Sequence, residues 1–139
     1  MPAFQFYQPI NVRYGDLDPQ GHVNNASYLT YLEEARIGYI KQLGLWTGGS
    51  FLDIGIIVAD AQVTFRMPLV YGVQVQVGVK VESIGGKSLK MAYSIEDHEA
   101  KIYATASTVL VAFDYHSGKT ILVPDDWRSA INSFEGINV

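Results

Sequence analysis

The chain has 139 residues, a length typical of one domain that buries a real hydrophobic core. Apolar residues make up 48% of it and charged residues 17%, a composition that excludes general disorder. With 14 acidic against 10 basic residues and no concentrated basic face, nucleic acid is excluded as an expected partner.

The sequence lacks the features expected of cysteine-based sites, metal sites, membrane spans and secretory signals. It contains no cysteine, which rules out disulfides, a thiol nucleophile and thiolate metal ligands. The longest apolar run, Ile54 to Ala59, is too short to cross a bilayer, so no membrane partner is expected. The N-terminus has no basic region ahead of an apolar run, and we expect a cytoplasmic protein. The three histidines lack ligand spacing with carboxylates, so neither a metal nor another cofactor is expected.

Alternating apolar and polar residues predict five strands. Pro9 places the first strand at a sheet edge or marks a bulge, because proline cannot donate to a strand ladder. In the second strand, strict alternation puts Ile57 on the same apolar face as Ala61, Val63 and Phe65. The predicted strands cover residues 4–14, 57–66, 71–82, 89–95 and 102–114.

Between the first two strands the apolar spacing changes to three and four residues. This predicts a long amphipathic helix from Asn25 to Leu43, which Gly44 can end. A short second helix is predicted over about residues 124–134, with Pro124 in its first turn. Antiparallel strands with one long helix indicate the α+β class, with the helix on one face of the sheet and residues 1–139 in a single domain.

The segment between the first strand and the long helix is the most informative. Residues 13–25 read Arg-Tyr-Gly-Asp-Leu-Asp-Pro-Gln-Gly-His-Val-Asn-Asn, which is too polar and too rich in turn residues for a core. A carboxylate such as Asp18 would face the start of the helix, where unpaired N–H groups and the positive dipole end suit an anion or a developing oxyanion. The same residues also suit a structural role, since Asp-Pro-x-Gly is a good turn and Asn24 or Asn25 a good N-cap.

Residues 16–25, followed by Tyr28 and by Glu33-Glu34-Ala35-Arg36, resemble the 4-hydroxybenzoyl-CoA thioesterase-like branch of the hotdog superfamily. The His-Val-Asn-Asn run is also similar to acyl-ACP thioesterases. The resemblance implies a hotdog fold, in which a five-stranded antiparallel sheet wraps around the long helix. It further implies that Asp18 is the catalytic carboxylate, that a backbone N–H near Asn25 polarises the thioester carbonyl, and that the pocket lies between two protomers.

The activity that this resemblance implies is hydrolysis of an acyl-CoA, or of an acyl carrier protein thioester. Asp18 would act as general base or as nucleophile, and His22 and Asn24 would position the water or the thioester. Apart from this resemblance, residues 85–88 after the third strand end like a phosphate loop but are more typical of a hairpin turn, in which Lys87 would be placed to touch a CoA phosphate. Family members that act on aromatic CoA esters carry bulky aromatic residues where this chain has residues 23–25, so a fatty or other acyl group is favoured. Because one helix leaves sheet edges uncovered, we expect a homodimer or homotetramer.

Two other functions remain open. A hotdog dehydratase or hydratase would act on hydroxyacyl thioesters, although its different arrangement of His and Asp or Glu is not found here. A non-catalytic protein could keep the pocket and bind acyl thioesters without turnover. A serine hydrolase is disfavoured because the chain contains no Gly-x-Ser-x-Gly motif.

Overall fold

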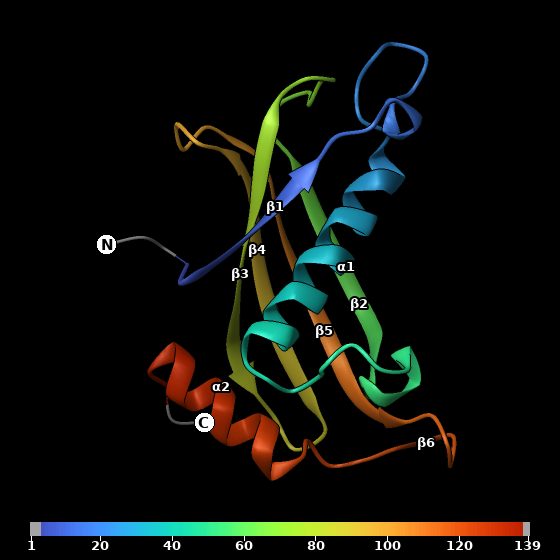
Figure 1. The fold of residues 1–139 in the computed structure, drawn as a ribbon, viewed down its shortest axis with the longest axis vertical. Helices are drawn as coiled ribbons and strands as arrows, with labels where there is room; N and C mark the ends of the chain where they lie inside the picture. Colours follow the sequence, from blue (N-terminus) through green and yellow to red (C-terminus); the bar gives the residue numbers. More distant parts are fainter. Residues whose placement is uncertain (1–3, 138–139) are drawn as a thin grey trace.

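The computed structural model describes residues 4–137. Figure 1 shows a curved antiparallel sheet with the long helix α1 crossing one face and the short helix α2 at one end. The strand order along the sheet is β1-β3-β4-β5-β2, and β6 pairs with β5. This arrangement confirms the predicted α+β class. The strands are β1 (Phe6–Asn11), β2 (Ile56–Phe65), β3 (Gln74–Ile84), β4 (Ser88–Asp97), β5 (Ile102–Asp114) and β6 (Lys119–Thr120), and the helices are α1 (Asn25–Gln42) and α2 (Asp125–Glu135).

The first strand is shorter than the sequence pattern predicted. β1 ends at Asn11, and Tyr14–Asp16 forms a turn of 3-10 helix instead of a strand end. The Asp16 carboxylate accepts a hydrogen bond from the backbone N–H of Arg13 at 3.0 Å, which stabilises this turn outside the sheet. Pro9 lies in an edge strand, as predicted, because β1 ends the strand order.

β2 departs from simple alternation. Its pairing with β5 shifts at a bulge between Val58 and Asp60, and a bulge inserts one residue that reverses the alternation of faces. Ile57 therefore lies opposite Val111, whereas Phe65 lies opposite Ala104, and these two β5 residues point to opposite faces of the sheet. The prediction that Ile57 shares a face with residues 61, 63 and 65 was wrong for this reason.

The C-terminal region adds a short strand and places α2. β6 was not predicted, because a two-residue strand is too short to show any alternation. α2 begins one residue later than expected, so that Pro124 is its N-cap residue rather than part of its first turn. Glu135 accepts hydrogen bonds from the Tyr39 hydroxyl at 2.6 Å and from the Val81 N–H at 3.0 Å. These contacts dock α2 beside the end of α1 and β3.

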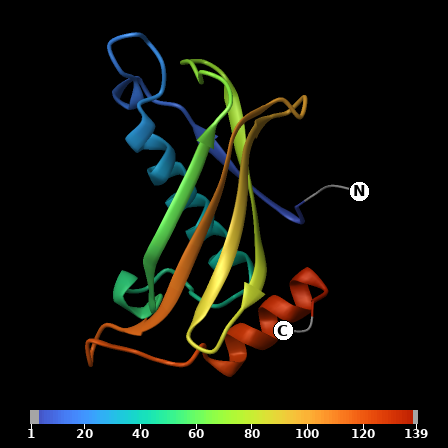
Figure 2. The ribbon, with the colours of Figure 1, turned by 180° about the vertical axis from the view of Figure 1, so that it is seen from behind.

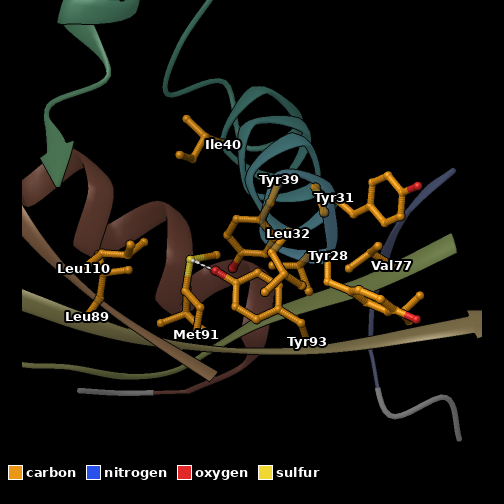
Figure 3. Packing of buried hydrophobic residues seen from close by; sticks show 14 of the residues in the cluster. Tyr28, Tyr31, Leu32, Tyr39, Ile40, Val77, Leu89, Met91, Tyr93 and Leu110 are labelled. Atoms are coloured by element: carbon orange, nitrogen blue, oxygen red, sulfur yellow. Dashed lines mark hydrogen bonds between the residues drawn. The ribbon is translucent and has the colours of Figure 1, made fainter. Parts of the chain in front are cut away.

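The core lies between α1 and one face of the sheet. Figure 3 shows Tyr28, Leu32 and Tyr39 of the helix pointing toward strand side chains that include Met91 and Tyr93. Within the described residues, the other face of the sheet carries no long helix across its middle (Figure 2). α1 packs closest to β1 and β3. Two pockets on the helix side are lined by residues of both α1 and the edge strand β2, and they mark a groove between these elements.

Candidate active site

The loop of residues 16–24 lies just before α1 and is closed by its own main chain. Leu17 and Val23 form an antiparallel bridge. Val23 donates its N–H to the carbonyl of Leu69 at 2.7 Å, and Asn24 donates its N–H to the carbonyl of Asp16 at 2.7 Å. The loop is thus tied both to itself and to the connection after β2, so its side chains have defined positions.

The carboxylate of Asp18 is half-buried and held by this loop. Its Oδ1 accepts hydrogen bonds from the backbone N–H of Gln20 at 2.9 Å and of His22 at 3.1 Å. With the Gln20 amide turned so that its nitrogen faces Asp18, that nitrogen lies 3.3 Å from both carboxylate oxygens. These bonds form the turn that the sequence suggested, and they also hold the carboxylate in one orientation.

A pocket of about 280 Å³ opens between the loop, the start of α1 and the end of β2. It brings together three of the predicted site residues, Asp18, His22 and Asn25. Sequence reasoning assigned no site role to the rest of its lining, which is Val23, Tyr28, Phe65, Arg66, Met67 and Pro68. Residues 65–68 reach the pocket through sheet pairing, which leaves no local signal in the sequence. Tyr28 was marked by the family motif but had no predicted role.

The start of α1, where Asn25 lines this pocket, leaves a backbone hydrogen-bond donor unpaired. Asn24 is the N-cap: its side-chain oxygen accepts from the N–H of Ala26 at 2.9 Å, and its carbonyl accepts from the N–H of Ser27 at 2.9 Å. The N–H of Asn25 has no hydrogen-bond acceptor within residues 4–137. An unpaired N–H at the positive end of a helix suits an anionic oxygen. The Asn24 side chain, by contrast, is used in the cap and does not line the pocket.

Asp16, the other carboxylate of the motif, is buried and has a different environment. Its Oδ2 accepts hydrogen bonds from the Tyr31 hydroxyl at 2.8 Å and from the Arg13 N–H, and the Arg13 guanidinium lies 3.6 Å from Oδ1. Burial alone would raise the pKa of Asp16, but these hydrogen bonds and the charge of Arg13 outweigh it and lower the pKa. Asp16 does not line the pocket, so it anchors the loop while Asp18 faces the cavity.

Lys87 does not belong to this pocket. It is exposed in the turn between β3 and β4, where its carbonyl accepts a hydrogen bond from the N–H of Ala112 at 2.8 Å. In Figure 1 this turn lies near α2, at the opposite end of the sheet from the loop that carries Asp18. A single copy of the chain therefore does not bring Lys87 together with Asp18.

Two kinds of feature are absent from residues 4–137. No group of three or more His, Asp or Glu side chains is placed there to hold a metal ion. None of the helices in this range combines the length and the apolar character needed to span a membrane.

Known proteins resemble this chain in sequence or in fold. FadM, a long-chain acyl-CoA thioesterase of Escherichia coli K12, is 27% identical over 124 residues, covering 88% of this chain and 93% of FadM. A thioesterase from Thermus thermophilus, crystallised with coenzyme A and Zn, is 32% identical with a TM-score of 0.86, covering 99% of this chain and all of that one. A 1,4-dihydroxy-2-naphthoyl-CoA thioesterase from Synechocystis, 22% identical, has the same fold with a TM-score of 0.82 over 94% of this chain and 97% of that one.

These structures confirm the predicted hotdog fold, with the sheet curved around the long helix. A family model described as the thioesterase-like superfamily matches residues 12–131, which is most of the sequence. The chain therefore belongs to the thioesterase-like superfamily.

Proposed function

We propose that the chain is an acyl-CoA thioesterase and that Asp18 is its catalytic carboxylate. The observation that carries this proposal is the pocket at the start of α1, which is lined by the half-buried carboxylate of Asp18, the imidazole of His22 and Asn25 with its unpaired N–H. Family membership and the relative that binds coenzyme A support a thioester as the substrate.

In the proposed mechanism the thioester carbonyl lies between Asp18 and the N–H of Asn25. That donor and the helix N-terminus stabilise the negative charge that develops on the carbonyl oxygen. In one route Asp18 takes a proton from water, the water oxygen bonds to the acyl carbon, and the C–S bond breaks to release the thiol after protonation. In the other, Asp18 attacks the carbon itself, the C–S bond breaks, the thiolate leaves and is protonated by water, and a second water hydrolyses the resulting anhydride to the free acid and Asp18. His22 positions the water or the thioester in either route.

The purified chain is expected to release free thiol from acyl-CoA esters, read with a colorimetric thiol reagent. The panel should span acetyl to palmitoyl esters and include hydroxybenzoyl-CoA and an acyl-carrier-protein ester, because residues 23–25 favour a fatty or other non-aromatic acyl group. Calorimetric binding without thiol release would instead support a non-catalytic binding protein. An enoyl product from a 3-hydroxyacyl-CoA, formed without thiol, would support a dehydratase.

We also propose that two copies associate through β2 to form a homodimer, or a homotetramer built from such dimers. β2 is a ten-residue edge strand on which Ile57, Val58 and Phe65 are 43–45% exposed. A long apolar edge strand is a template for pairing with another chain. Antiparallel pairing about a two-fold axis would turn the second copy end over end, so that its Lys87 comes to the same end of the joined sheet as Asp18 of the first copy.

Light scattering after size-exclusion chromatography should therefore give the mass of two or four chains. The expected mass follows from 15.4 kDa per chain. A concentration-independent mass of one chain would contradict the association and, with it, any contribution of Lys87 to the pocket of a second copy.

A further inference from the structure

A second pocket, of about 400 Å³, lies farther along the groove between α1 and β2. The mechanism proposed above does not use it. Most of the side chains that line it are apolar, and one is a buried arginine. The lining residues are Glu33, Arg36, Ile37, Phe51, Ile54, Ile56, Ile57, Val58 and Tyr115.

The two pockets occupy one side of α1. Positions that line the first and the second pocket follow one another along a single helix face, because they are three or four residues apart. These positions are Asn25 in the first pocket and Glu33 and Arg36 in the second, with Leu29 between them on the same face. On β2, Phe65 lines the first pocket and Val58 the second. Between them in the sequence of each element, Leu29 of the helix is 48% exposed and Ala61 of β2 is exposed, so an apolar side chain is accessible on each element between the two pockets.

Arg36 gives the second pocket its chemical character. Its side chain is 7% exposed, and its Nη1 donates to the Tyr93 hydroxyl at 3.2 Å, which in turn lies 2.7 Å from Oγ1 of Thr108. The carboxylate paired with Arg36, that of Glu33, is 3.9 Å from Nη2 and belongs to a side chain that is 69% exposed. A guanidinium carries five donors and a permanent charge. Its charge is therefore weakly compensated at the wall of an apolar pocket.

We propose that the second pocket binds the distal end of the acyl group and that Arg36 selects acyl groups bearing an oxygen acceptor there, a carboxylate in the strongest case. This inference rests on the proposed function, since it takes the thioester to lie at Asp18. Asn25 and Arg36 are about 16 Å apart along α1 at ~1.5 Å per residue. An extended chain advances ~1.2 Å per bond, so about a dozen carbon atoms span that distance.

Charge complementarity favours this ligand over a plain fatty chain. A methyl end would press against a buried cation without satisfying its donors, and burying charge without a partner is costly. A carboxylate at the same place accepts charge-assisted hydrogen bonds from the guanidinium, and these are the stronger kind.

The test compares dodecanedioyl-CoA with dodecanoyl-CoA, which differ only at the distal end. Binding is measured by calorimetry on the full chain carrying Asp18→Asn, so that turnover does not interfere. We expect the carboxyl-terminated ester to bind roughly tenfold more tightly, as one hydrogen bond to a charged group provides. Equal affinity for the two esters would overturn the proposal.

Three variants in the same Asp18→Asn background locate the effect. Arg36→Met should abolish the preference, so that the two esters bind with equal affinity, and Lys41→Met, at an exposed position of the same helix, should keep it. Glu33→Gln changes an exposed side chain, so the fold should persist, and the preference should rise several-fold because the compensating charge is removed. A preference that survives Arg36→Met, or one that Glu33→Gln leaves unaltered, would overturn the role of Arg36.

The outcome separates the two proposals. A carboxyl preference without thiol release from any ester in the wild-type chain would leave this pocket assigned and end the thioesterase proposal. Thiol release without any preference for the carboxyl-terminated ester would support the thioesterase proposal and end the proposed role of the second pocket.

Discussion

Replacing Asp18 with Asn should lower the rate of thioester hydrolysis by about 10²–10⁴-fold, the range typical of a lost general base. An amide cannot take the proton from water and is a poor nucleophile toward a thioester. The asparagine still offers an Oδ1 to the N–H groups of Gln20 and His22, so the loop should keep its shape. We therefore expect acyl-CoA affinity and thermal stability close to wild type, measured by calorimetry and by thermal unfolding on the preparation used for kinetics.

Asp126→Asn is the matched control for this change. Asp126 is exposed on α2, which lies at the opposite end of the sheet from the loop that carries Asp18 (Figure 1). The same loss of charge at this position should leave kcat unaltered. Near-normal turnover of Asp18→Asn would refute the catalytic assignment. A lowered melting temperature together with lost binding would mean instead that Asp18 acts as a turn residue.

Asp16→Ala should lower the free energy of unfolding by about 1–3 kcal/mol, because the buried hydroxyl of Tyr31 and the N–H of Arg13 lose their acceptor. Since Asp16 anchors the loop that carries Asp18, turnover should fall as well. Urea unfolding followed by tryptophan fluorescence measures the first effect, and thiol release under native conditions measures the second. Unchanged stability would show that the loop is held without this carboxylate.

Asp16→Asn separates charge from hydrogen bonding, because its amide oxygen can still accept. The pKa of Asp16 is lowered in the fold, so its ionised form stabilises the protein above the unfolded value of about 3.9, and this contribution is lost as pH falls through the lowered folded value. The gap in unfolding free energy between wild type and Asp16→Asn should thus be constant near neutral pH and shrink below about pH 3.9. A gap that stays the same at lower pH would contradict a role for the charge.

The elements whose signal is local could be predicted closely from the sequence. The long helix was expected over residues 25–43 and runs from Asn25 to Gln42, because its three- and four-residue spacing is strong and Asn24 caps it. What failed depends on a side-chain hydrogen bond to the main chain or on irregular strand pairing, neither of which the alternation of apolar and polar residues shows. β1 ends early because Asp16 captures the Arg13 N–H, and β2 changes face at a bulge that no alternation rule reveals.

The candidate site shows the same division. Asp18, His22 and Asn25 could be named because they belong to one short segment and a recognisable motif, and the pocket contains all three. Arg66 comes from the end of β2, and only the folded sheet places it beside them. Arg36 stood in the quoted motif, but its burial against Tyr93 depends on how α1 lies on β4, which the sequence does not reveal.

The main-chain pairing of the loop before α1 has a consequence for the kinetics of ligand association. Bridges from Leu17 to Val23 and from His22 to Val70 hold a turn-rich segment in place through main-chain pairing. A receptor organised in advance loses little conformational entropy on complex formation, and its backbone differs by about 1 Å or less between free and occupied states. The rate of acyl-CoA association should then be set by diffusion into the groove. We expect association kinetics with a single phase and no slow rearrangement at high ligand concentration.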